Sequence, residues 1–212
     1  VVYNQSIFFI NTFRNFCNGK IGDDELNAIL FDFIIHHTEE FNGLFDIHFN
    51  YNTENFIAEI KSNLHRKIAR MKELELLKNR LNDDEVLRNI ETAFKSAFYM
   101  HFRHIYNNSK KYKLKEHFKV AVFFLIRSLA YSGMFRYNSK GGFNVPYGGM
   151  GYNTKTLKSK IEYFSSNILS TILDKTTIEN LDFEDFLEKN EYTKDDFIFL
   201  DPPYDSEFST YA

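Results

Sequence analysis

Apolar residues recur at steps of three and four along much of residues 54–106, which is the spacing of one face of an α-helix. One stretch covers residues 54–81 and a second covers residues 85–106. The polar residues 82–84 between them supply a turn and the cap of the next helix. The two stretches therefore predict the arms of a helical hairpin, although the long stripe of the first would also suit a coiled-coil partner.

Shorter helical patterns lie on both sides of this hairpin. Residues 4–6 and the pair Asp23 and Asp24 supply caps for the helices that precede it. Residues 41–52 are rich in Asn and Phe and predict a loop or a short strand. The further predicted helices cover residues 7–18, 23–40, 117–129, 156–169 and 183–189.

The pattern changes after residue 130. Residues 131–151 hold six of the nine glycines and Pro146, which is typical of turns and short strands. Short apolar runs at residues 1–3, 176–178 and 197–200 predict strands. These strands alternate with helices near the end of the chain, and that order is typical of a parallel sheet.

The remaining composition narrows the class of protein. The single cysteine, Cys17, excludes an internal disulfide, so a reducing cytoplasm is the expected location. No apolar run approaches the ~20 residues that cross a bilayer, and we expect no membrane partner. His36 and His37 are adjacent and point in different directions, so we expect no metal site. The chain begins at Val1 rather than Met, and we expect both of its ends to be cut.

Positive charge is concentrated in one segment of the chain. The whole chain has a formal net charge of −3. Residues 103–160 nevertheless hold twelve Lys or Arg and one acid, Glu116, a net charge of +11. Aromatic residues are interleaved with these cations, among them Tyr106, Tyr112, Tyr131, Phe135, Tyr137, Phe143 and Tyr147. This combination favours a nucleic-acid partner, and a solvated basic surface is the alternative.

Two blocks of sequence together resemble the Dam-type DNA adenine-N6 methyltransferases. The first reads Tyr131-Ser-Gly-Met-Phe-Arg-Tyr-Asn-Ser-Lys-Gly-Gly-Phe-Asn-Val-Pro-Tyr-Gly148 and is similar to the target-recognition hairpin of that family. The second, Asp201-Pro-Pro-Tyr204, is similar to the catalytic turn. The first block departs from the family pattern only at Ser132, where the family has Asn, and at Tyr147, where it has Phe. Weaker resemblance extends from Val1 to the end, apart from most of residues 20–115.

The resemblance implies a catalytic role for residues 201–204. The exocyclic amine of adenine is a poor nucleophile because its lone pair is delocalised into the ring. The Asp201 carboxylate and the Pro202 carbonyl would accept its two hydrogens and aim its lone pair at the methyl group of S-adenosylmethionine. Tyr204 would stack on an adenine flipped out of the duplex, and Pro203 would help to fix the turn.

Only part of the cofactor site is expected in this chain. The glycine-rich loop of the family has no counterpart and would lie before Val1. Gln5 stands where the family has the Asp that holds the ribose of S-adenosylmethionine. Asp182 and Phe183 resemble the pair that contacts the adenine of this cofactor, with a helix cap and a core Phe as the alternative, and Asp201 completes the expected set. Residues 1–212 alone are therefore expected to bind S-adenosylmethionine weakly or not at all, and to be inactive.

The resemblance also assigns contacts with duplex DNA. Arg136 is expected to read a base edge, because its fork pairs bidentately with guanine. Tyr131 corresponds to the position that wedges into the base stack, and Pro146 lies near the groove. Asn138 and Asn144 either contact DNA or stabilise the turn. Phosphate contacts, which position without specifying sequence, are expected from Lys110, Lys111, Lys113 and Lys140.

These inferences predict an α/β fold with an incomplete Rossmann-like sheet, interrupted by a predominantly α-helical target-recognition insert. We expect residues 1–19 and 152–212 to form part of the catalytic domain. Residues 20–151 would form the insert, which ends in a recognition hairpin at residues 131–151.

The expected function is site-specific methylation of the adenine N6 amine in double-stranded DNA, as part of restriction-modification. A cognate endonuclease is a further partner, and a monomer is expected. One alternative is a catalytically inactive DNA-binding fragment, and another is methylation of RNA or protein. A purely structural helical bundle leaves both sequence blocks and the basic segment unexplained.

Overall fold

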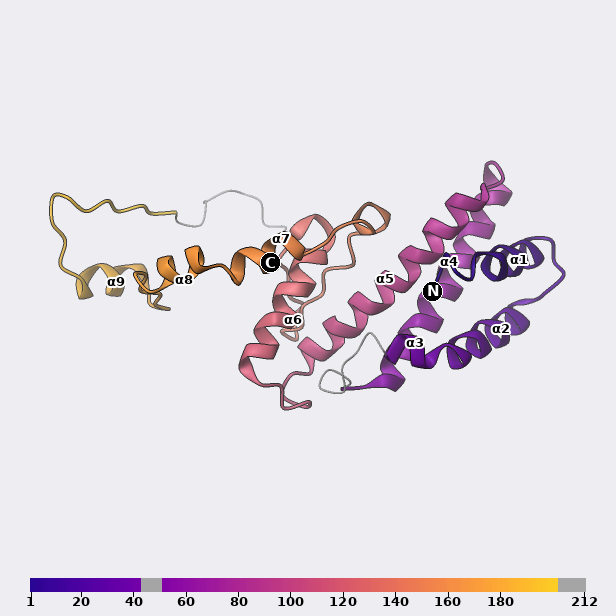
Figure 1. Ribbon diagram of the computed structural model, residues 1–212, viewed down its shortest axis with the longest axis horizontal. Helices are drawn as coiled ribbons and strands as arrows, with labels where there is room; N and C mark the ends of the chain where they lie inside the picture. The colour runs from indigo at the N-terminus through magenta and orange to yellow at the C-terminus, as the bar shows by residue number, and fades with distance from the viewer. Residues whose placement is uncertain (43–50, 202–212) are drawn as a thin grey trace. The chain divides into compact units, whose positions relative to one another are not determined.

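The computed structural model describes residues 1–42 and 51–201, and the chain divides into two compact units, Val1–Lys155 and Thr156–Ala212 (Figure 1). The first unit is helical and ends in a glycine-rich loop. Its helices are α1 (Ser6–Cys17), α2 (Asp23–His36), α3 (Thr38–Asn42), α4 (Thr53–Leu77), α5 (Asp83–Asn107) and α6 (Glu116–Leu129), with short 3₁₀ turns η1 (Tyr131–Gly133) and η2 (Met150–Tyr152). The second unit contains α7 (Lys158–Phe164), α8 (Asn167–Leu173) and α9 (Phe183–Lys189).

Helices α4 and α5 form the hairpin on which the first unit is built, and they make the most extensive helix pair in it (Figure 1). Both helices are capped by asparagine. At the start of α5, the Asn82 side chain accepts from the Glu85 amide at 2.9 Å, and the Glu85 carboxylate accepts from the Asn82 amide at 2.9 Å. This capping box satisfies two amides that a helix start leaves unpaired. The predicted helical hairpin is therefore confirmed.

Helices α1 and α2 pack on this hairpin through aromatic and aliphatic residues, with Phe9, Phe13 and Leu30 fully buried. Arg14 fixes α1 to the turn between α4 and α5. Its guanidinium lies 2.7 Å from the Glu75 carboxylate and 2.8 Å from that of Asp83. Helix α6 packs on the other end of α5, so α5 is the central helix of the unit.

The strands predicted at residues 1–3, 176–178 and 197–200 are absent from the described residues, and this part of the fold prediction is not met. Val2 lies in a turn and is buried in the helical core. Residues 176–178 and 197–200 are irregular, and Phe197 is 88% exposed. A strand forms only when a neighbouring strand takes its backbone hydrogen bonds, and an apolar run does not by itself provide that neighbour.

The second unit has no core among its described residues, 156–201, where every side chain is exposed or half-buried. The single helix predicted at residues 156–169 is two helices, because the chain turns at Ser165 and Ser166. The Ser166 hydroxyl accepts from the Leu169 amide and so begins α8. Helix α9 confirms the predicted helix at residues 183–189.

Within residues 1–42 and 51–201, no helix combines the length and apolar character needed to cross a membrane. In the same residues, no three His, Cys, Asp or Glu side chains gather in a way that could hold a metal ion.

His101 makes the stability of the first unit depend on pH. Its ring is 2% exposed, and its Nδ1 lies 3.0 Å from the Asn55 side-chain amide. Burial, and secondarily the charge of His104, lower the pKa of His101 from 6.5 to about 4. Between these two values the unfolded chain binds a proton that the folded chain does not, so protons favour unfolding.

We therefore expect the free energy of unfolding to fall as the pH falls from about 6.5 to about 4, by at most roughly 3 kcal/mol from this group. Urea unfolding at a series of pH values, followed by circular dichroism, measures it. A His101→Gln variant should lose much of this pH dependence, and the same change at the half-buried His104 should lose less. Identical pH profiles for wild type and His101→Gln would contradict the assignment.

Candidate nucleic-acid interface

The glycine-rich loop, residues 131–151, is a hairpin-shaped loop rather than a hairpin of continuous strands. Its arms meet at two isolated antiparallel bridges, Ala130 with Tyr147 and Tyr137 with Phe143. The first arm is longer than the second between these bridges, and η1 takes up the additional residues. Ser132, within η1, has a positive φ of 53°. Asn tolerates this left-handed conformation better than Ser does. This explains why Asn suits position 132 in the family pattern that residues 131–148 resemble.

The tip of the loop is closed by Asn138. Its side-chain oxygen accepts from the amides of Lys140 at 3.0 Å and Gly142 at 2.9 Å. Gly141 has a φ of +75°, which glycine adopts without strain. Asn138 therefore stabilises the turn, while Lys140 is exposed at the tip.

The second arm of the loop is held by a row of polar side chains on α5. Asn107 accepts from the amide of Phe143 at 2.8 Å and donates to the carbonyl of the same residue at 3.0 Å. Tyr99 and Arg103 both donate to the carbonyl of Val145, at 2.8 and 2.9 Å. Phe143 and Val145 are themselves buried, so these side chains satisfy backbone groups that water does not reach.

The end of the loop is fixed to α5 by Asn153, which is buried. Its amide donates to the Thr92 hydroxyl at 3.0 Å, and its oxygen accepts from the Tyr147 hydroxyl at 3.4 Å. Gly148 lies directly against the ring of Tyr152, where a Cβ atom would come within 2.4 Å of the ring. Any larger residue at this position would have to displace the Tyr152 ring.

An aromatic cluster joins the loop to α5 and α6. The hydroxyls of Tyr106 and Tyr137 lie 3.0 Å apart, and Phe123 packs edge-on against Phe135 and Phe143. Burial, followed by the hydrogen bond with Tyr106, raises the pKa of Tyr137 to about 12. Tyr137 therefore stays neutral at physiological pH and acts as part of the packing.

Arg136 is half-buried and oriented by Asn144 across the loop. Its Nε donates to the Asn144 side-chain oxygen at 2.9 Å, and its Nη2 approaches the Asn144 carbonyl at 3.4 Å. These two contacts are made by Nε and Nη2, on one edge of the guanidinium. The arrangement resembles a preorganised fork, in which the side chain loses little further entropy when its outer N–H groups bind an acceptor.

The other expected DNA contacts are on the surface of the same unit. Tyr131 is 54% exposed, and Pro146 is exposed on the second arm. Lys110, Lys111 and Lys113 belong to the link between α5 and α6, and all three are exposed. This link is fixed by Tyr112, whose hydroxyl lies 2.9 Å from the Asn52 amide and 3.0 Å from a ring nitrogen of His104.

The expected cofactor residues are divided between the two units. Gln5 begins α1 in the first unit, where its side chain makes no cap hydrogen bond. Asp182 caps α9 in the second, accepting from the Glu184 amide at 3.0 Å, and Phe183 beside it is 60% exposed rather than in a core. Asp201 is exposed, and the expected catalytic residues Pro202, Pro203 and Tyr204 lie outside the described residues.

Sequence reasoning missed the side chains that position the loop. Tyr99, Arg103 and Asn107 are spaced four residues apart, so they form one stripe along α5. That spacing is a detectable signal, but the apolar face of the helix dominates the pattern. Asn153 carries no comparable signal, because its partner on α5, Thr92, is distant in the sequence.

The chain matches the D12 class N6 adenine-specific DNA methyltransferase family model over residues 75–212. This match covers more than half of the chain, so the chain belongs to that family.

Its relatives include the Type II methyltransferase M.CviBI of Paramecium bursaria Chlorella virus NC1A, 36% identical over 50% of this chain and 39% of the relative. The Type II methyltransferase M.MjaIII of Methanocaldococcus jannaschii is 33% identical over 61% of this chain and 43% of the relative. The Retron Ec67 DNA adenine methylase of Escherichia coli is 28% identical over 70% of this chain and 46% of the relative. The matches thus span less than half the length of these relatives, and no solved structure matches the chain.

Replacing Asn107 with Ala tests how the loop is held. The change leaves the buried amide and carbonyl of Phe143 without their partner, and we expect it to lower the free energy of unfolding by about 1–3 kcal/mol. The neighbouring Asn108 donates to the His104 carbonyl of its own helix, so Asn108→Ala should change stability by about 0.5 kcal/mol or less. Urea unfolding measures both, and equal decreases would contradict the role of Asn107.

Proposed function

We propose that this chain supplies the target-recognition part and the catalytic turn of a site-specific DNA adenine-N6 methyltransferase that acts on duplex DNA in restriction-modification. The observation that carries the proposal is the glycine-rich loop, a preformed surface loop fixed to α5 within a segment of net charge +11. Family membership and the names of the relatives support the same activity.

The loop would read DNA with Arg136 and Tyr131. The outer N–H groups of Arg136 suit the two acceptors that guanine presents in the major groove. The exposed Tyr131 ring is suited to wedge between bases, with Pro146 beside it near the groove. Lys140 at the tip and the lysines of the α5–α6 link would contact phosphates. Asn138 and Asn144 make hydrogen bonds to other residues of the loop, and this leaves Arg136 as the main candidate for base specificity.

Residues 201–204 would act on an adenine flipped out of the duplex, because its N6 amine is unreachable inside the stack. The Asp201 carboxylate and the Pro202 carbonyl would each accept one amine hydrogen, so that the nitrogen becomes pyramidal and its lone pair is no longer delocalised into the ring. Asp201 thus acts by orientation and hydrogen bonding, and a strong base is not required. Tyr204 would stack on the flipped base, and the two prolines would keep the turn rigid.

S-adenosylmethionine, when bound, supplies the methyl group. The residues of this chain fit part of its surroundings: the exposed Phe183 ring offers a packing face, and the second carboxylate oxygen of Asp182 can accept a hydrogen bond. Gln5 would contact a ribose hydroxyl without the help of a negative charge, and Asp201 would complete the set of residues that hold the cofactor. This partial set favours weak binding of the cofactor by residues 1–212 alone.

We also infer that the second unit completes a Rossmann-like sheet with other parts of the enzyme. Its apolar side chains support this, because Ile178, Phe197 and Phe199 are 79%, 88% and 76% exposed. Side chains of this kind are normally buried in parallel strands. The division into catalytic residues 1–19 and 152–212 and an insert at residues 20–151 is part of the same proposal. A catalytically inactive DNA-binding fragment is the second candidate, favoured by the absence of a core in the described part of this unit.

The role of Asp201 can be tested in a complete methyltransferase that carries these residues. We expect Asp201→Ala to lower methyl transfer to adenine by a factor of about 10² or more, because the amine is no longer oriented. Duplex binding should change little, since phosphate and base contacts come from the first unit. Transfer of labelled methyl groups and fluorescence anisotropy of duplex DNA measure the two properties. Asp195→Ala, which removes an exposed acid of the same unit, is the matched control, and equal reduction of binding and transfer in Asp201→Ala would contradict the role.

A further inference from the structure

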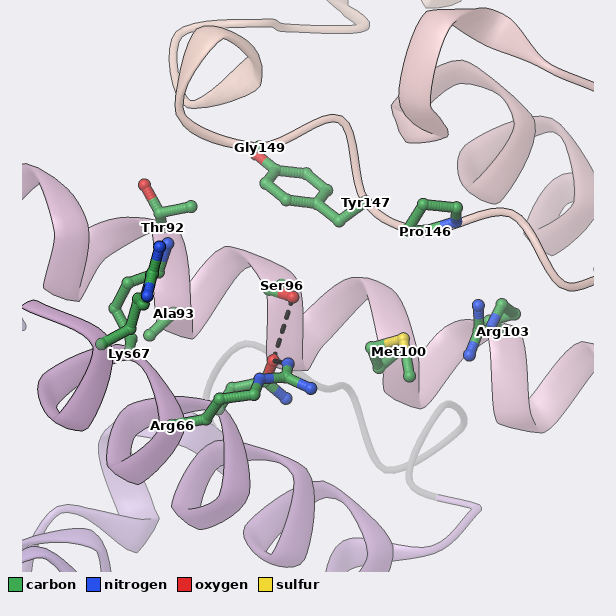
Figure 2. Close-up of a pocket in the computed structure, with 12 residues that line it drawn as sticks. Arg66, Lys67, Thr92, Ala93, Ser96, Met100, Arg103, Pro146, Tyr147 and Gly149 are labelled. Carbon is green, nitrogen blue, oxygen red and sulfur yellow. Dashed lines mark hydrogen bonds between the residues drawn. The ribbon is translucent and has the colours of Figure 1, made fainter. Parts of the chain in front are cut away.

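A basic cavity lies between α4, α5 and the second arm of the glycine-rich loop (Figure 2). Its volume is about 460 Å³. Helix α4 contributes Arg66, Lys67 and Arg70, and α5 contributes Ser96 and Arg103. The loop closes one side of the cavity with Pro146, Tyr147 and Gly149. The cavity is therefore contiguous with the loop that we propose to read DNA.

The charge of this cavity is positive and unbalanced. Arg66, Lys67, Arg70 and Arg103 line it together, and no Asp or Glu is among the described residues that do so. Burial, followed by the charge of Arg66, lowers the pKa of Lys67, as expected for an amine in positive surroundings. Arg70 also pairs with Glu73 at 2.7 Å, and both side chains are about 60% exposed, where solvent screens the pair.

Neutral groups hold the arginines in place without cancelling their charge. The Asn63 side-chain oxygen accepts from Arg66 Nη2 at 2.6 Å and from the Ser96 hydroxyl at 3.0 Å, the latter drawn as a dashed line in Figure 2. Arg103 donates to the carbonyl of Val145 at 2.9 Å. Each guanidinium has further N–H groups, and a planar fork of this kind matches the oxygens of a phosphate.

We propose that this cavity binds phosphodiester groups of the duplex whose bases the glycine-rich loop reads. The inference rests on the proposed function, and it adds a backbone contact made largely by α4. Residues 63–70 precede the part of the chain that matches the family model, residues 75–212, so the family match does not describe this contact. The favoured ligand is DNA rather than a small anion, because the loop and the cavity share Pro146 and Tyr147. A free phosphate has the same chemistry and is distinguished below.

The test measures how tightly the chain binds duplex DNA over a range of salt concentrations, with fluorescence anisotropy as the readout. The double variant Arg66→Gln and Arg70→Gln removes two charges from the cavity. We expect it to bind more weakly at every sequence, and the slope of log K against log salt to be smaller by about 0.9 for each phosphate that the variant no longer neutralises. The variant Arg66→Lys and Arg70→Lys keeps both charges and should retain most of the binding.

A matched control removes two charges elsewhere. Lys20 and Lys78 are exposed and do not line the cavity, so their double replacement by Gln should leave the slope near that of wild type. Ser96→Asp places a carboxylate in the cavity and should also weaken binding, which provides a second measurement if the arginine variant does not fold. Circular dichroism checks the fold of each variant.

The outcomes separate this site from the proposed function. If the wild type binds duplex DNA and both cavity variants bind it with the same slope and affinity as the wild type, the proposed site is wrong. The proposed function then still stands. Failure of the wild type to bind duplex DNA contradicts the proposed function as well as the site. Calorimetry with inorganic phosphate completes the test: phosphate binding that is abolished in the arginine variant, together with unchanged DNA binding, identifies a small-anion site and overturns the proposal.

Discussion

The pairing of Asn107 with Phe143 is the interaction on which the position of the glycine-rich loop depends. A side-chain amide carries one acceptor and a donor group, as a backbone peptide does, so Asn107 supplies Phe143 with the two hydrogen bonds that a neighbouring strand would give. Helix α5 therefore takes the place of a partner strand. For this reason the glycine-rich loop is ordered and hairpin-shaped although no sheet supports it in the described residues.

Other features of the first unit follow from this arrangement. With the second arm fixed on α5, the Asn144 side chain is available to orient Arg136 on the first arm. The same arm carries Val145, whose carbonyl accepts a hydrogen bond from Arg103. This contact places the Arg103 cation in the wall of the basic cavity. The proposed base reading and backbone contact would thus depend on one anchored segment. A rigid support of this kind lowers the entropy that would otherwise be lost when the loop binds its target.

The helices could be predicted from the sequence better than the strands, for a physical reason. Helix hydrogen bonds are local, so apolar spacing and the asparagine cap at residue 82 are enough to locate α5. Strands depend on neighbours, and the runs at residues 176–178 and 197–200 have none among the described residues. In the candidate site, the turn-rich loop at residues 131–151 could be predicted from the sequence. The roles of Asn107 and Asn153 could not, because each acts on residues far along the chain.

The central claim is that the anchored loop reads DNA sequence through Arg136. Its most direct test is the base preference of duplex binding, measured on a library of sites for wild type, Arg136→Ala and the exposed-tip variant Lys140→Ala. The account predicts that Arg136→Ala loses about 1–3 kcal/mol of discrimination at one base pair, whereas Lys140→Ala weakens binding equally at all sequences. An unchanged preference profile in Arg136→Ala would contradict the account.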